Sequence, residues 1–121
     1  MNLGQPAQVS KAHQQAKTML NWLKSLFTSG PSIADLLEDG ALVLDVRTLG
    51  EYRNGHVNGS MHVPLQQLEK KINAIKKQKK TVVTVCASGM RSGKAAKMLR
   101  AAGLDAHNGG PWHNVDRLIQ R

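Results

Sequence analysis

The stretch TVVTVCASGMRS, residues 81–92, gives the clearest indication of the fold of this chain. Its first five residues are apolar or β-branched, which is typical of a strand buried inside a sheet. The small residues at 87–91 predict a tight loop, and a helical pattern follows from Ser92 to Ala102. Cys86, the single cysteine of the chain, therefore falls where a buried strand ends and a helix is about to begin.

Strand-like and helix-like segments alternate along the chain on both sides of this stretch. A continuous apolar run at 41–44 ends in Asp45 and indicates a second buried strand. This alternation predicts an α/β fold with a small parallel β-sheet flanked by helices on both faces. The expected strands are 41–44, 61–63, 81–85 and 105–107, and the expected helices are 32–40, 65–75, 92–102 and 112–119.

Ligands of parallel sheets bind outside the carboxyl ends of the strands. Asp45 and Cys86 both occupy such ends, so the sequence predicts that a functional site lies near them. A thiol under backbone amides and a helix N-terminus is a reactive thiolate more often than a packing residue. The alternative is a buried, inert cysteine that ends a core strand.

Composition sets the limits of this prediction. The chain has 121 residues, of which 40% are hydrophobic and 3% aromatic, so one compact domain with an aliphatic core is expected. A net charge of +9 fits small anionic substrates, nucleic acid or an anionic membrane. One cysteine allows no internal disulfide, and no Cys/His spacing suggests zinc, so neither a metal nor a cofactor is expected. A free reactive thiol favours a reducing, cytoplasmic compartment.

The N-terminal part is expected to lie outside the domain. Residues 1–18 are polar and without a pattern, which predicts a flexible tail. Apolar residues at helical spacing follow, so we interpret 19–30 as an amphipathic helix and linker, and 31–121 as the domain. Lys24 interrupts the apolar part, so an export signal is not expected. No apolar run approaches the roughly 20 residues that span a bilayer, and no membrane partner is expected.

The loop after Cys86 can stabilise a negative charge in three ways. If residues 87–91 curl around the sulfur, successive backbone amides form an anion-binding nest. Gly89 allows the positive φ that such a turn needs. Arg91 adds a full positive charge and the helix adds its positive end, and all three lower the pKa of the thiol.

Three segments together resemble the rhodanese-like sulfurtransferases. The segment DVRTLGEYRNGHVNGSMHVP, residues 45–64, resembles the first signature of that family. The segment CASGMRS, residues 86–92, resembles the active-site loop, and NGGPW, residues 108–112, resembles the closing region. Their order and spacing agree with the family over about residues 32–120, so the chain is similar to rhodanese-like domains over most of its length.

The resemblance implies covalent sulfur transfer in two half-reactions. The cysteine would take sulfane sulfur from thiosulfate or a related anionic donor and pass it to cyanide or a thiol, and an acidic sulfur-relay protein is a further possible partner. Cys86 would be the nucleophile and persulfide carrier. The residues expected to bind the substrate are Ala87, Ser88, Gly89, Met90, Arg91 and Asp45, with Arg91 holding the anionic donor.

The chain departs from the family pattern at two positions. Family members commonly have proline where this chain has Leu49, and asparagine where it has His62. His62 is expected to be exposed to solvent, and His56 to hydrogen-bond to the backbone of its turn. The resemblance also implies that Arg47 pairs with Glu51 and braces the region near the loop.

Three other functions remain open from the sequence. A non-catalytic rhodanese-like module is one, although such modules usually lose the cysteine. A cysteine phosphatase or arsenate reductase is another, but those families place five residues between cysteine and arginine, whereas four separate Cys86 from Arg91. The third is nucleic-acid binding by the lysine-rich segment 70–80. This segment lacks interleaved aromatic residues, so a solvated helix face is favoured and no nucleic acid is expected. A docking surface for the acidic partner stays open as an alternative.

Overall fold

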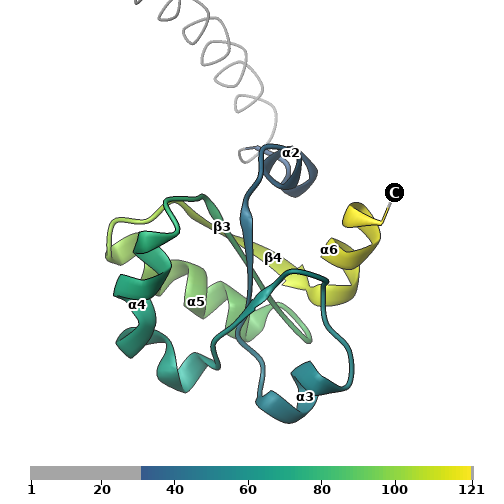
Figure 1. Cartoon of the computed structure of the whole chain (residues 1–121), viewed down its shortest axis with the longest axis horizontal. Coiled ribbons are helices and arrows are strands. Elements are labelled where there is room, and N and C mark those ends of the chain that lie inside the picture. The colour runs from purple at the N-terminus through teal and green to yellow at the C-terminus, as the bar shows by residue number, and fades with distance from the viewer. Residues whose placement is uncertain (1–30, 121) are drawn as a thin grey trace, which may run out of the picture. The chain divides into compact units, whose positions relative to one another are not determined.

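The computed structural model of the chain describes residues 31–120. The tail and amphipathic helix predicted for 1–30 lie outside this range. Four parallel strands form one sheet in the order β2-β1-β3-β4, which confirms the predicted fold class (Figure 1). The strands are β1 (Leu42–Asp45), β2 (Met61–His62), β3 (Val82–Cys86) and β4 (Ala106–Pro111).

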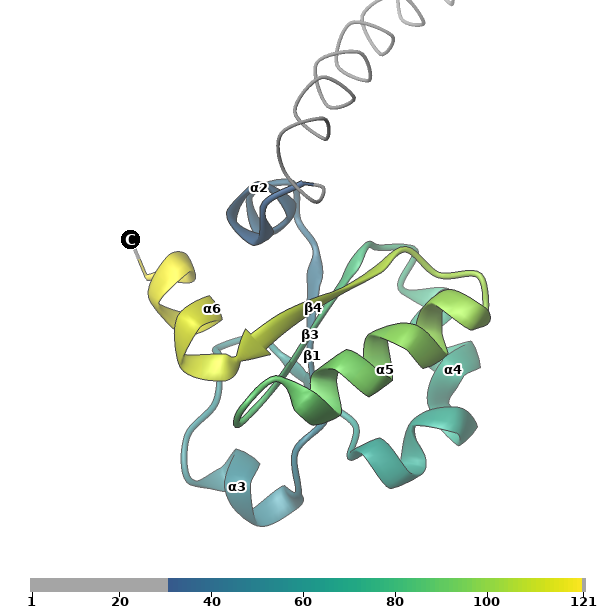
Figure 2. The same ribbon diagram turned by 180° about the vertical axis from the view of Figure 1, so that it is seen from behind.

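Helices cover both faces of this sheet. Helices α4 and α5 lie on one face and α2 and α6 on the other, while α3 lies beyond the carboxyl end of β1 (Figures 1 and 2). The helices are α2 (Ile33–Glu38), α3 (Leu49–Arg53), α4 (Leu68–Lys77), α5 (Met90–Ala101) and α6 (Trp112–Ile119), with a 3-10 turn η1 at Leu65–Gln67. Within residues 31–120, no helix combines the length and the apolar character that crossing a bilayer requires.

The boundaries of α4 and α5 differ from the sequence-based expectation. The helix expected at 65–75 is divided, because the chain first makes the η1 turn after Pro64 and then continues as α4. Helix α5 begins at Met90, two residues before Ser92, because Gly89 adopts φ +100° and turns the chain directly into the helix.

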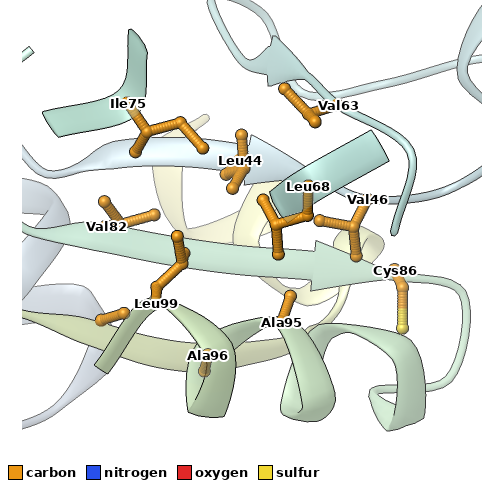
Figure 3. Packing of buried hydrophobic residues seen from close by; sticks show 11 residues of the cluster. Leu44, Val46, Val63, Leu68, Ile75, Val82, Cys86, Ala95, Ala96 and Leu99 are labelled. Carbon is orange, nitrogen blue, oxygen red and sulfur yellow. The ribbon is translucent and has the colours of Figure 1, made fainter. Parts of the chain in front are cut away.

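The core lies on both sides of the sheet, because successive side chains of a strand point to opposite faces. The aliphatic side chains under α2 and α6 form the smaller cluster. The larger cluster fills the space between the sheet and helices α4 and α5, and Figure 3 shows Cys86 at its edge, at the carboxyl end of β3. The members labelled there are Leu44, Val46, Val63, Leu68, Ile75, Val82, Cys86, Ala95, Ala96 and Leu99.

Strand β4 is longer than the three residues expected, and a bulge explains its course. Thr84 pairs with Asn108 but Cys86 pairs with Pro111, so β4 holds one more residue than β3 over this interval. Gly109 lies so close to β3 that an added Cβ would stand 2.8 Å from the carbonyl oxygen of Thr84. Glycine at this position therefore lets β4 approach β3, and it leaves Asn108 beside the loop that follows Cys86.

Candidate active site

Two strand-to-helix turns meet at the carboxyl edge of the sheet. Strands β1 and β3 are parallel neighbours, and Asp45 is in register with Val85. The turn after Asp45 leads into α3, and the turn after Cys86 leads into α5. The sequence prediction that Asp45 and Cys86 come to the same edge is therefore confirmed.

The sulfur of Cys86 accepts hydrogen bonds from the first turn of α5 and from the residue that precedes it. The amide of Gly89 lies 3.0 Å from Sγ and the amide of Ser92 lies 3.3 Å from it. The hydroxyl of Ser92 also lies 3.3 Å from the sulfur. Ser92 was absent from the predicted site, although a hydroxyl residue in the first helical turn after a strand-end cysteine was a signal that could have found it.

These hydrogen bonds decide the acidity of the thiol. Burial raises the pKa of Cys86, which has no exposed surface. Hydrogen bonds from the hydroxyl and amide of Ser92, and from the amides of Gly89 and Ser88, outweigh burial and hold this pKa below its ordinary value. The sulfur therefore lies where a negative charge is stabilised.

The N-terminus of α5 is open to an anion because no side chain of the helix caps it. Gly89 is the N-cap residue and has no side chain to accept the first amides. The unsatisfied amides carry the positive end of the helix dipole, and here the amide of Ser92, with that of Gly89, donates to the sulfur. The remaining loop residues, Ala87 and Ser88, are exposed, and Met90 has 81% of its surface exposed.

Arg91 forms a two-point ion pair with Glu51 of α3. The two guanidinium–carboxylate distances are 2.8 and 2.9 Å. The hydrogen bond from Arg91, followed by that from the amide of Thr48, lowers the pKa of Glu51 to about 2. The prediction that Arg47 pairs with Glu51 is wrong for the carboxylate, which Arg91, 40 residues further along the chain, occupies. Arg47 donates instead to the main-chain carbonyl of Glu51, at 3.3 Å.

Arg47 instead binds Asp45, and the two form a buried pair. Both carboxylate oxygens of Asp45 accept from Arg47, at distances of 2.7 to 3.0 Å. Arg47 also donates to the carbonyl of Gly55 and lies 4.8 Å above the ring of Trp112. Asp45 has no exposed surface, so in this arrangement it fixes Arg47, and its expected contact with a substrate stays a prediction.

The two histidines of the first signature have backbone partners. His56 lies 2.8 Å from the carbonyl of Tyr52, which confirms the expected turn contact. The prediction that His62 is exposed is wrong, since its ring stacks on Tyr52 and its Nε2 lies 2.8 Å from the carbonyl of Arg47. This half-buried ring links β2 to the end of β1.

The comparisons with known proteins agree with this fold. The family model of the rhodanese-like domain matches residues 29–112. Among curated proteins, the chain is similar to YqhL of Bacillus subtilis, with 40% identity over 63 residues, which cover 52% of this chain and 49% of that protein. It is also similar to the thiosulfate sulfurtransferase PspE of Escherichia coli, with 33% identity over 61 residues, which cover 50% of this chain and 59% of that protein.

Solved structures show the same fold. A structure described as a rhodanese with anions from E. coli has a TM-score of 0.57 and 28% identity, and the match covers 62% of this chain and 91% of that one. A rhodanese-related protein from Thermoplasma volcanium has a TM-score of 0.56 and 32% identity, covering 72% and 86%. The chain spans 33% to 59% of the length of the curated relatives it matches. Since the family model matches more than half of its residues, the chain belongs to the rhodanese-like domain family.

Proposed function

We propose that this protein is a sulfurtransferase that carries sulfane sulfur on Cys86. In the first half-reaction, the thiolate attacks the outer sulfur of thiosulfate, a new S–S bond forms at Sγ, and the bond to sulfite breaks. Sulfite leaves with the electron pair. In the second half-reaction, cyanide or a thiolate attacks the outer sulfur of the persulfide, and the Cys86 thiolate is regenerated.

The observation that carries this proposal is the pair of amides aimed at the sulfur from an uncapped helix N-terminus. The amides of Gly89 and Ser92 stabilise the thiolate before attack and the returning thiolate after transfer. Because the loop between Cys86 and Arg91 is one residue shorter than that of cysteine phosphatases, it suits one additional sulfur atom better than a phosphate.

The donor needs access to a sulfur that has no exposed surface. Reactive cysteines are usually partly exposed, so the loop has to open during the reaction. We place this movement in residues 87–90, three of which are exposed. Glu51 holds Arg91 at the end of this segment, which makes the ion pair the fixed point about which the loop would open.

Intact mass spectrometry tests the proposal directly. After incubation with thiosulfate, the protein should gain the mass of one sulfur atom and lose it again on addition of cyanide. Cys86→Ser should gain nothing. An unchanged mass with thiosulfate and with organic persulfide donors would favour the non-catalytic module instead. Release of phosphate from a phosphotyrosine analogue, without thiocyanate formation, would favour the phosphatase.

For the anionic donor and an acidic relay partner, we propose an approach along α5. A groove of about 530 Å³ borders the Cys86 loop, and it contains no acidic side chain. The lysine-rich end of α4 lies instead near the amino end of β3, about 15 Å from the sulfur along a five-residue strand. The residues that line the groove are Gly89, Met90, Gly93, Lys94, Lys97, Arg100 and Asn108.

Two matched charge reversals separate these surfaces. Lys94→Glu with Lys97→Glu should slow sulfur loading from thiosulfate at low salt by about three- to tenfold. Lys76→Glu with Lys80→Glu changes the net charge equally and should have a much smaller effect. Equal losses in both pairs would mean that only the total charge matters, and would contradict the proposed approach along α5.

A further inference from the structure

Asn108 of β4 contacts the Cys86 site through three hydrogen bonds. Its Oδ1 accepts from the hydroxyl of Ser92 at 2.7 Å and from the amide of Gly110 at 2.9 Å. Its Nδ2 donates to the carbonyl of Gly89 at 3.0 Å. Asn108 is therefore bonded to Gly89 and Ser92, whose amides lie 3.0 and 3.3 Å from the sulfur.

The orientation of this side-chain amide is fixed by its backbone partners. Oδ1 faces the N–H of Gly110, and Nδ2 faces the carbonyl of Gly89. A reversed amide would set a donor against a donor and an acceptor against an acceptor. Oδ1 therefore remains an acceptor toward Ser92, and the short contact between them requires the hydroxyl proton of Ser92.

The hydroxyl of Ser92 has one proton but two neighbours that can accept it. When it donates to Asn108, its oxygen can only accept a proton from the S–H of Cys86, 3.3 Å away, which favours the thiol. When Cys86 ionises, its sulfur can only accept, so the hydroxyl must turn to it and abandon Asn108. The hydrogen bonds of Ser92 to the thiolate and to Asn108 exclude one another.

We propose that Asn108 is a positioning residue that holds the Ser92 hydroxyl proton away from Cys86 and thereby limits formation of the thiolate. The amides of Gly89 and Ser92 favour the thiolate at all times, whereas the hydroxyl favours it only after leaving Asn108. This inference concerns the ionisation of Cys86 and does not depend on sulfur transfer. If the proposed function holds, a persulfide restores the Ser92–Asn108 bond, because its bridging sulfur carries no negative charge and accepts a hydrogen bond less well than the amide oxygen of Asn108.

Charged groups around this end of the sheet are kept constant in the test. They are Arg91 and Lys94 of α5, Glu51 of α3, and the Asp45–Arg47 pair at the end of β1. Each retains its residue in every variant, so changes in titration report on the hydroxyl and the amide side chain.

A double-mutant cycle between Ser92 and Asn108 tests the proposal. Cys86 is the single cysteine of the chain, so the part of the ultraviolet absorbance change with pH that is missing from Cys86→Ser reports its thiolate. Because Asn108 competes for the hydroxyl proton, removing the hydroxyl by Ser92→Ala should reduce the thiolate fraction less while Asn108 is present than in its absence. In the Asn108→Ala protein, the same substitution should reduce the thiolate fraction by about three- to tenfold, measured at a pH below the midpoint of the Cys86 titration.

If Asn108 only tethers the loop through Gly89, Asn108→Ala changes the thiolate fraction by the same factor in the wild type and in the Ser92→Ala protein, and this result would overturn the proposal. Circular dichroism checks the fold, and Asn73→Ala on the exposed surface of α4 is the matched control.

A second variant serves if Asn108→Ala does not fold. Asn108→Asp keeps an acceptor toward Ser92 and Gly110 and strengthens it. The thiolate fraction should fall, and it should fall less when Ser92 is replaced by alanine. A fall of the same size in both backgrounds would reflect the added charge alone and would refute the proposed role of the hydroxyl.

Discussion

The two strand-to-helix turns at the carboxyl edge begin alike and end differently. In the turn after β1, Thr48 and Glu51 form a capping box that closes the N-terminus of α3 with its own side chains. In the turn after β3, Gly89 leaves the N-terminus of α5 without a side-chain cap. The amides that a cap would have taken donate to the sulfur of Cys86 instead.

This difference assigns separate tasks to neighbouring turns of one sheet. We call the first turn the saturated turn, because its charged and hydrogen-bonding groups already have partners. Arg47 neutralises the carboxylate of Asp45, and side chains cap the N-terminus of α3. The second keeps its positive helix end for an anion. Glu51 joins the two, since the carboxylate that caps α3 also binds Arg91 at the start of α5.

The largest expected effect comes from breaking the saturated turn. Asp45→Asn leaves the charge of Arg47 buried without a counter-charge and should reduce the free energy of unfolding by about 3–5 kcal/mol. Asp39→Asn, at an exposed acid, is the control and should cost little. Urea unfolding at neutral pH measures both. If the two variants are equally stable, the first turn is not the rigid one, and the comparison fails.

A side-chain cap at the N-terminus of α5 should slow the reaction of Cys86. Gly89→Asp supplies a carboxylate that competes with the sulfur for the amides of the first turn of α5. Gly89→Ala carries the same strain at φ +100° without the cap and is the matched control. Persulfide formation should be about tenfold slower in the aspartate variant than in the alanine variant. Equal rates would show that the uncapped terminus contributes nothing to reactivity.

The sequence predicted the backbone of this edge better than its side-chain pairing. The buried runs before Asp45 and Cys86 predicted two adjacent strands, because strand periodicity and apolar composition are local signals. Gly89 predicted a positive φ in the loop for the same reason, although not the start of α5 at Met90. The length of β4 was missed, since it depends on the close approach of Gly109 to β3, which no local pattern records.

Partners of the polar side chains depend on contacts that are distant in the sequence. Glu51 was assigned to Arg47, four residues away, but it binds Arg91, 40 residues away. Asn108 contacts Ser92 because it is in register with Thr84 of β3, and β3 leads through Cys86 into the start of α5. Spacing along the chain could not distinguish these pairings, because each requires the register of two strands and the start of a helix to be known.

Arg91 connects the capped helix α3 to the uncapped helix α5, so its removal tests both turns. Arg91→Ala removes a positive charge beside the loop and leaves the carboxylate of Glu51 unpaired. Use of thiosulfate, measured as kcat/KM, should fall about tenfold more than use of an uncharged organic trisulfide. Adding Glu51→Gln to this variant should restore part of the loss. Equal losses for both donors would mean that Arg91 acts on the loop and not on the charge of the donor.

The smallest expected effect lies in the capping box, and it should leave Cys86 untouched. Thr48→Ala removes the side-chain acceptor for the amide of Glu51 and should cost about 1 kcal/mol of stability, without changing the thiolate fraction of Cys86. A change in that fraction would mean that the two turns are coupled through Glu51.

The carboxylate of Glu51 also makes the stability of the fold depend on pH. The pKa of Glu51 lies at about 2 in the folded protein, below its ordinary value of 4.5. A lowered pKa stabilises the fold fully above pH 4.5, and this contribution fades as the pH falls toward 2. The stability difference between the wild type and Glu51→Gln should therefore be largest at neutral pH and shrink at about pH 3. If this stability difference stays constant between neutral pH and about pH 3, the carboxylate of Glu51 does not stabilise α3 through the capping box and the Arg91 pair. The rigidity of the saturated turn would then come from Arg47 alone.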